Sequence, residues 1–187
     1  MNAMRATRDI TDTTTAYSAA RHRPHGHDWR DAGDAWGRRA RDWACLFEHY
    51  ATDAIIAMFA ELRVGPATSV LDIACGSGLA LRFADAAGAR TAGIDAASSL
   101  IEIACERTPS GDIRLGDMFD LPWDDESFDV VMSINGIWGG CEGALAEAYR
   151  VLRPGGSIAI SFWGHGHLDL RPCFKAFAAN APASHLE

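Results

Sequence analysis

The stretch that decides the fold is residues 69–89, "SVLDIACGSGLALRFADAAGA". A short apolar run leads to Asp72, and glycines follow at 76 and 78 before an alanine-rich amphipathic segment. This order predicts a buried strand, a tight turn and a helix. So little side chain at the end of a buried strand indicates that a ligand approaches the backbone at this turn.

Strand and helix patterns alternate after this stretch. Apolar runs predict further strands at 90–95, 112–118, 128–135 and 157–163, and amphipathic patterns predict helices at 98–108, opened by Ser98 or Ser99, and at 142–153. The alternation predicts an α/β fold with a doubly wound, mostly parallel sheet and helices on both faces. Ligands of such sheets bind beyond the carboxyl ends of the strands, which is where Gly76 and Gly78 lie.

The N-terminal part of the chain differs from this pattern. Residues 1–28 are polar and lack periodicity, so we expect a mobile arm or a loosely packed helix. Residues 29–64 are helical in pattern, with glycines at 33 and 37 that favour more than one helix. Aromatic residues recur there every seven positions, close to one helical face: Trp29, Trp36, Trp43 and Tyr50.

Composition limits the classes of function. A chain of 187 residues with 48% hydrophobic and 22% charged residues fits one globular domain. The net charge of -8 argues against a nucleic-acid partner, because non-specific binding depends on Lys and Arg neutralising phosphates. No apolar run is as long as a membrane span, and the first residues do not resemble a signal peptide, so we expect no membrane partner and a cytoplasmic location.

Cysteine and histidine spacing gives no metal site. The five cysteines contain no CxxC pair, which fits neither a zinc site nor a compact disulfide framework. His-Gly-His occurs at 25–27 and at 165–167, but a flexible glycine does not preorganise two ligands. We therefore predict no metal. His165 or His167 follows the last strand and is a candidate general base; the alternative is a solvated loop histidine.

The glycine turn suits two classes of cofactor. A dinucleotide requires G-x-G-x-x-G/A, and this chain has Leu81 at the third position, which opposes that class. Asp95 ends the second strand, 19 residues after Gly76, and is placed to accept hydrogen bonds from ribose hydroxyls. Since both cofactor classes use such an acid, Asp95 does not distinguish them.

Four motifs in order make the distinction: "VLDIACGSG", "GID" at 93–95, "GDMFDLPWDDESFDVV" at 116–131 and "LRPGG" at 152–156. With them, residues 30–164 resemble the class I S-adenosylmethionine-dependent methyltransferases, especially the small-molecule branch. The resemblance implies a Rossmann-like domain at 65–164 that binds S-adenosylmethionine, a lid segment at 29–64, and methyl transfer to a small organic acceptor. The alternatives are a catalytically silent S-adenosylmethionine-binding partner protein and, opposed by Leu81 and "LRPGG", a nicotinamide oxidoreductase.

The resemblance also implies site residues. It assigns the methionine part of the cofactor to Asp72, Ala74, Cys75, Gly76 and Gly78, the ribose to Asp95, and the adenine to Ala96, Asp117 and Met118. It places Ser133 and Asn135 between the methionine and the acceptor, with Asn135 also a candidate catalytic residue. It also places Trp36 and Trp43 in a lid over the cofactor; the alternative is that these tryptophans simply pack on the domain.

The end of the chain departs from the family's pattern. The resemblance implies a helix and an antiparallel strand pair after the fifth strand, and residues 165–187 have room only for a short tail or helix. We therefore expect the strand pair to be missing and residues 157–163 to form an open sheet edge. An apolar open edge invites pairing, so a homodimer through it is expected.

Overall fold

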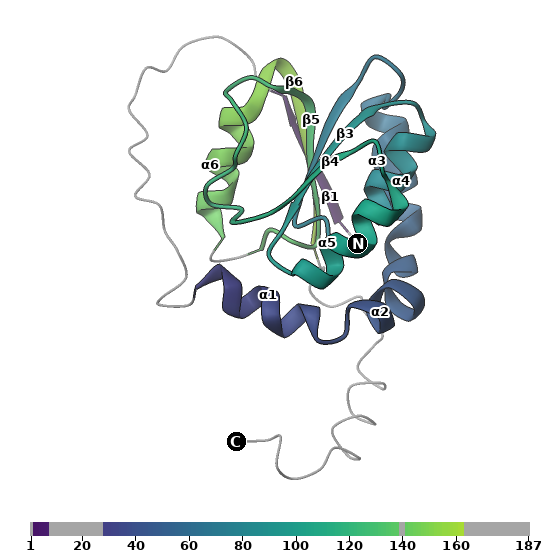
Figure 1. Ribbon diagram of the computed structural model, residues 1–187. Helices are drawn as coiled ribbons and strands as arrows, with labels where there is room; N and C mark the ends of the chain where they lie inside the picture. Colours follow the sequence, from purple (N-terminus) through teal and green to yellow (C-terminus); the bar gives the residue numbers. More distant parts are fainter. Residues whose placement is uncertain (1, 8–27, 139–140, 163–187) are drawn as a thin grey trace.

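A computed structural model describes residues 2–7, 28–138 and 141–162. Their strands form one six-stranded sheet in the order β1-β6-β5-β2-β3-β4 (Figure 1). The strands are β1 (Asn2–Thr7), β2 (Ser69–Ile73), β3 (Arg90–Asp95), β4 (Asp112–Leu115), β5 (Phe128–Ile134) and β6 (Leu152–Phe162). All neighbours from β6 to β4 pair in parallel, which confirms the predicted Rossmann-like α/β fold.

Helices cover both faces of the sheet. They are α1 (Trp29–Gly37), α2 (Ala40–Asp42), α3 (Thr52–Leu62), α4 (Leu79–Ala86), α5 (Ser98–Arg107) and α6 (Glu142–Val151). Because side chains alternate along a strand, Val70 of β2 packs with α3 and α4, and its neighbour Leu71 packs with α6 on the opposite face. Both are 0% exposed, so β2 lies at the centre of the hydrophobic core.

The expected open edge is wrong. β1 pairs antiparallel with β6, in a register that runs from Asn2 opposite Phe162 to Thr7 opposite Ser157. This pairing occupies the backbone groups that an open edge would present, so a homodimer through that edge loses its basis. The six residues of β1 also belong to the part of the chain expected to be a mobile arm or a loosely packed helix. Residues 165–187, the expected tail, lie outside the described residues.

Two helix boundaries differ from the predictions. The last helix ends at Val151, and β6 already begins at Leu152, with a register shift opposite Phe128 and Val130 that accommodates the "LRPGG" run. The N-cap of α5 is Ala97 rather than a serine. The hydroxyl of Ser99 instead donates to the carbonyl of Gly37, 2.8 Å away, and so connects α5 to the end of α1.

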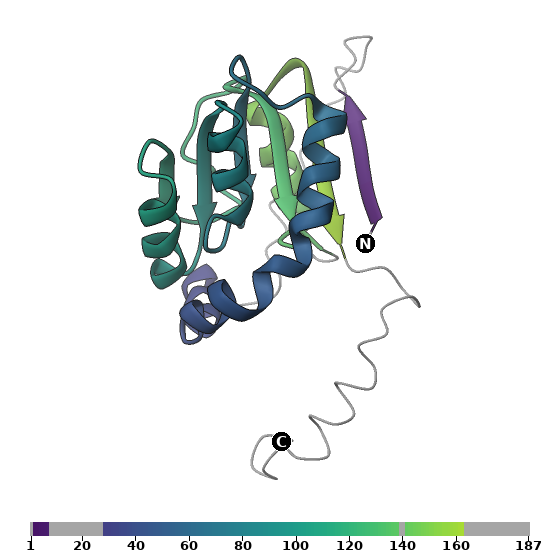
Figure 2. The same cartoon turned by 90° about the vertical axis from the view of Figure 1, so that its right-hand side faces the viewer.

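Two short helices lie across one end of the sheet. Figure 2 shows α1 and α2 at the end toward which the parallel strands point. Gly33 allows α1 to approach this closely, because a Cβ atom there would lie 1.9 Å from the carbonyl oxygen of Ala96, just after β3. The predicted division of this region into separate helices is confirmed, with the break after Gly37.

Candidate functional site

The loop between β2 and α4 is built for close approach to its backbone. Ala74, Gly76 and Gly78 have positive φ angles of 59°, 54° and 77°, so the chain turns sharply and α4 begins directly at Leu79. A Cβ atom on Gly78 would lie 2.9 Å from the Cβ of Ala104 in α5, so the turn packs tightly on that helix. We call residues 74–78 the glycine loop.

A cavity of about 80 Å³ lies between the glycine loop and the lid segment. From the sheet side, Asp72, Ala74, Cys75 and Gly76 line it. From the lid segment, Trp43 lines it, and the indole Nε1 is 3.9 Å from where a Cβ on Gly76 would stand. The structure therefore brings five of the predicted site residues together around one cavity.

Asp72 places a carboxyl group in the wall of the cavity. The side chain is 2% exposed, and among the described residues its Oδ1 has no hydrogen-bond partner. Burial, with the nearby charge of Asp95 as a second cause, raises the pKa of the Asp72 carboxyl well above its usual range. A buried carboxylate in this situation favours a ligand that carries a positive charge or hydrogen-bond donors.

Asp95 holds the glycine loop in place from the end of β3. Its Oδ2 accepts a hydrogen bond from the backbone N–H of Gly76 at 2.8 Å, and its Oδ1 accepts one from Ala97 at 2.9 Å. Burial raises the pKa of Asp95, and the backbone N–H groups of Ala97, Gly76 and Ala96 oppose that shift. Each carboxylate oxygen has a second lone pair, so Asp95 can still accept from a ligand.

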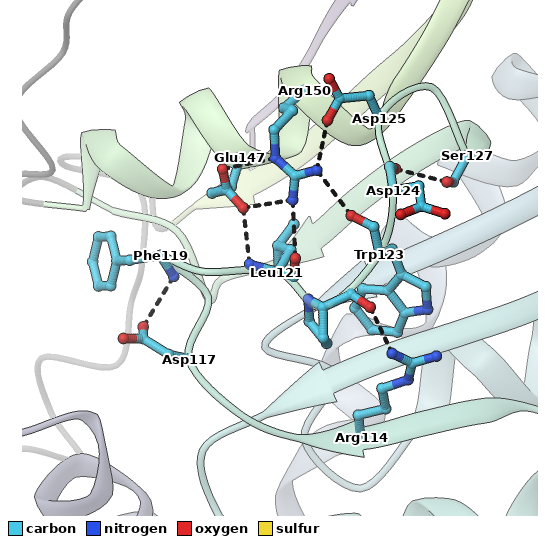
Figure 3. A network of polar contacts seen from close by, with 11 residues as sticks. Arg114, Asp117, Phe119, Leu121, Trp123, Asp124, Asp125, Ser127, Glu147 and Arg150 are labelled. Carbon is cyan, nitrogen blue, oxygen red and sulfur yellow. Dashed lines mark hydrogen bonds and ion pairs between the residues drawn. The ribbon is translucent and has the colours of Figure 1, made fainter.

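The loop after β4 carries two of the three predicted adenine contacts, Asp117 and Met118, and the third, Ala96, directly follows β3. Asp117 is 9% exposed, and its Oδ1 accepts from the backbone N–H of Phe119 at 2.9 Å. Arg150 in α6 fixes the following turn by donating to the carbonyls of Leu121 and Trp123, at 2.9 and 2.8 Å (Figure 3). Met118 packs against the core on this side of the sheet.

The two predicted residues at the end of β5 have different roles. Ser133 is 0% exposed, and its hydroxyl donates to the carbonyl of Ile73 at 2.7 Å, so it joins β5 to β2 and does not line the cavity. Asn135 has a positive φ of 57°, and its side-chain amide donates to the hydroxyl of Tyr50 at 3.0 Å. Burial raises the pKa of Tyr50, and the Asn135 hydrogen bond opposes the shift.

Several residues that line the cavity were not among the predicted site residues, and Glu48, Tyr50 and Ser77 are the polar ones. The sequence offers a signal for Tyr50, which is its place in the seven-residue aromatic repeat. In the structure the Tyr50 and Trp43 rings meet edge-on, with their centroids 6.1 Å apart. No sequence pattern singles out Glu48. Trp36 packs edge-on against Trp43 at 5.3 Å but is 58% exposed and does not line the cavity.

Other candidates for chemistry are limited. In residues 2–7, 28–138 and 141–162, no three metal-ligating side chains of the His, Cys, Asp and Glu types form a group. Burial raises the pKa of the Cys75 thiol well above its usual range, with the charges of Asp72 and Asp95 acting in the same direction, so this thiol is held neutral.

No helix in the described part of the chain is long and apolar enough to cross a membrane. His165 and His167 lie outside the described residues.

Comparison with known proteins agrees with this geometry. Residues 71–160 match the family model described as "Methyltransferase domain". A malonyl-[acyl-carrier protein] O-methyltransferase of Salmonella typhimurium is 32% identical over 156 residues, which are 80% of this chain and 61% of that protein.

Solved structures give the same result. A putative methyltransferase in complex with the Haloferax volcanii Trm112 methyltransferase activator is 33% identical with a TM-score of 0.58, over 70% of this chain and 58% of that chain. A Geobacter sulfurreducens methyltransferase in complex with S-adenosyl-L-homocysteine is 29% identical with a TM-score of 0.51, over 58% and 47%.

The fold, the glycine loop and these matches point to one class: residues 71–160 match a methyltransferase domain, and the relatives and neighbours support the class I S-adenosylmethionine-dependent methyltransferase family. These matches support the predicted family, and the neighbour in complex with S-adenosyl-L-homocysteine agrees with the predicted cofactor, S-adenosylmethionine. The chain spans 61% of the length of the Salmonella typhimurium relative and half or less of several other curated relatives.

Proposed function

We propose that this chain transfers a methyl group from S-adenosylmethionine to a small organic acceptor. The observation that carries the proposal is the buried Asp72 carboxylate, whose Oδ1 has no partner among the described residues and which lines a cavity closed by Gly76 and Trp43. The cofactor is a sulfonium cation with an ammonium group at its methionine end. A low-dielectric cavity with an unneutralised carboxylate suits such a ligand better than it suits an anionic pyrophosphate.

The remaining predicted residues extend this site along the carboxyl ends of the strands. Asp95 would receive the ribose hydroxyls on its second lone pairs, and Ala96, Asp117 and Met118 would border the adenine. Gly78 would shape the turn, and Ser133 would fix β5 to β2. Trp43 would cover the methionine end, with Trp36 packed behind it. A cytoplasmic location is part of the same proposal.

The transfer itself would be an in-line displacement. An acceptor atom attacks the methyl carbon, the bond from carbon to sulfur breaks, and S-adenosylhomocysteine leaves with both electrons of that bond. The positive charge already activates the methyl group, so the protein contributes mainly alignment, for which effective molarities reach about 10⁵–10⁸ M. Asn135 and Tyr50, which are joined by a hydrogen bond, would face the acceptor.

The test uses cofactor labelled at the methyl group and incubated with the chain and a metabolite extract. We expect label in an organic product together with S-adenosylhomocysteine. Binding of S-adenosylmethionine measured by calorimetry, without any labelled product in extracts of several sources, would favour the silent binding protein. Absence of binding would contradict the proposal altogether.

A further inference from the structure

A buried ionic cluster joins the lid segment to the glycine loop and to α5. Glu48 is 4% exposed, its Oε1 accepts from Nη1 of Arg107 at 2.7 Å, and its Oε2 accepts from the hydroxyl of Ser77. Arg107 also donates to the carbonyl of Ser77 at 3.1 Å and to that of Ala44 at 3.3 Å. We call these three residues, Glu48, Ser77 and Arg107, the Glu48 cluster.

The cluster sits at an irregular part of the helical segment. Residues Trp43–Phe47 form a π-helix and Glu48–Ala51 a 3₁₀ helix, between α2 and α3. Short π and 3₁₀ stretches inside a helix frequently mark hinges and functional sites. We call residues 43–51 the lid joint. On one side of it α1 and α2 pack on α5, and on the other side α3 packs on the sheet.

One backbone hydrogen bond connects the Glu48 cluster to Trp43, whose side chain lies beside the glycine loop. The N–H of Glu48 donates to the carbonyl of Trp43, so the residue bound to Ser77 and the residue over Gly76 move together. Both line the same cavity. We therefore expect that a displacement of the Glu48 backbone away from the glycine loop also lifts the Trp43 indole from Gly76.

The chemistry of the cluster suits a joint that opens. A buried ion pair pays a desolvation cost, and well-packed apolar residues of similar volume are often at least as stabilising. Once the joint opens, however, water can solvate Glu48, Ser77 and Arg107, which lowers the free energy of the open state. An apolar contact would instead make opening unfavourable, because it would expose apolar surface.

We propose that Glu48 is a positioning residue that latches the lid joint closed on the glycine loop and thereby sets the rate at which S-adenosylmethionine leaves. This inference rests on the proposed function, since it takes the cavity as the cofactor site. Glu48 acts through Trp43 and Ser77 and takes no part in the methyl transfer itself.

Ser77→Ala tests the latch, because it removes only the hydroxyl that connects Glu48 to the glycine loop and leaves the ion pair with Arg107. Glu48→Gln removes the charge as a second variant. Ser99→Ala is the matched control: it breaks another hydrogen bond between the lid segment and α5, to the Gly37 carbonyl, without touching the cavity.

Two measurements separate the latch from the proposed function. Amide hydrogen exchange of the cofactor-free chain, followed by mass spectrometry, should accelerate in residues 43–51 but not in 52–62 in both test variants. Stopped-flow dissociation of S-adenosylmethionine should become roughly 10-fold faster, the effect of losing one hydrogen bond to a charged group. Ser99→Ala should change neither measurement by more than about twofold.

Unchanged exchange in residues 43–51, or unchanged cofactor dissociation, in folded Ser77→Ala would overturn the latch. An equal response of Ser99→Ala would also overturn it, because any loosening of the lid segment would then suffice. If the wild-type chain binds no S-adenosylmethionine, the proposed function fails, and the exchange measurement alone decides whether Glu48 holds the joint closed.

Discussion

The two walls of the cavity are built by different physical means. The glycine loop is held largely by its backbone: by positive φ angles at Ala74, Gly76 and Gly78, and by the hydrogen bond that the Gly76 N–H donates to the Asp95 carboxylate. The lid joint is held by side chains distant in sequence, through Glu48, Ser77 and Arg107. We therefore expect the glycine loop to keep one shape, and call it the rigid wall; the lid joint, which the latch proposal allows to separate from it, is called the movable wall. A site that must bind and release a large cofactor is expected to combine a rigid wall with a movable one.

Asp95→Ala gives the largest expected effect and tests the rigid wall. The variant loses the proposed ribose contacts and also frees the Gly76 and Ala97 N–H groups. Two charge-assisted hydrogen bonds and a loosened loop should weaken S-adenosylmethionine binding by about 2–4 kcal/mol, or roughly 30- to 1000-fold. Calorimetry measures the change. Asp95→Asn, which keeps one acceptor oxygen, should lose less affinity for S-adenosylmethionine. A loss of affinity under about threefold in folded Asp95→Ala would contradict the assignment of Asp95 to the ribose.

The rigid wall is also the part that could be predicted from sequence. Its strand, turn and helix follow within residues 69–89, and each is signalled by local hydrophobic periodicity and glycine spacing. Asp72, Gly76 and Asp95 could be found because each ends a predicted strand or begins its turn. In a parallel sheet such positions converge on one edge.

The movable wall could not be predicted in the same way. Glu48 and Ser77 are 29 residues apart, and Ser77 and Arg107 are separated by a further 30. A lone glutamate in a helical segment usually lies on a solvated surface, and only tertiary packing buries this one. The pairing of β1 with β6 has the same origin, because residues 2–7 carry no clear strand pattern and the available edge of β6 determines their structure.

Asp72→Asn should change cofactor binding and protein stability in opposite directions. Neutralising the carboxylate should weaken S-adenosylmethionine binding by about 1.5–3 kcal/mol, or roughly 10- to 150-fold. The cofactor-free chain should become more stable at neutral pH, by on the order of 1–3 kcal/mol, because a buried charge with an unpaired oxygen is removed. Titration calorimetry and urea denaturation measure the two effects.

The pH dependence of Asp72 has a definite sign. Its pKa in the folded chain is raised, so the folded state binds the proton more tightly than the unfolded state does. The cofactor-free chain therefore loses stability as the pH rises from the ordinary aspartate value through the raised folded value. Asp72→Asn should lack this loss. Cofactor affinity should rise over the same pH interval, as the carboxylate becomes charged; identical pH profiles for both chains would contradict the assignment.

Gly33→Ala tests whether the position of α1 matters to the movable wall, which α1 contacts through Trp36 and Trp43. A Cβ atom there would lie 1.9 Å from the Ala96 carbonyl oxygen, so α1 must shift away from the end of β3. Overpacking of this kind costs about 1–3 kcal/mol, and we expect S-adenosylmethionine binding to weaken roughly 5- to 150-fold. Gly65→Ala is the control, because a Cβ at Gly65 meets nothing within 4 Å. Equal affinities of the two variants would show that the seating of α1 does not matter to the cofactor.

The smallest expected effect concerns Ala74, where the rigid wall carries strain. Its φ is 59°, a left-handed conformation that costs a residue with a Cβ about 1–2 kcal/mol. Ala74→Gly removes this strain but makes the unfolded chain more flexible, at a cost of about 0.5–1 kcal/mol.

The net result should be a gain in unfolding free energy of about 0.5 kcal/mol, with cofactor affinity nearly unchanged. The matched control is Ala87→Gly, at a residue with an ordinary φ of -79°, which should only destabilise. Because the two variants make the same chemical change, the difference between their denaturation midpoints isolates the strain. If Ala74→Gly is destabilised as much as Ala87→Gly, the glycine loop stores no strain at Ala74, and its shape depends instead on the packing of Gly136 against Ala74, where a Cβ on Gly136 would lie 2.4 Å from the Ala74 Cβ.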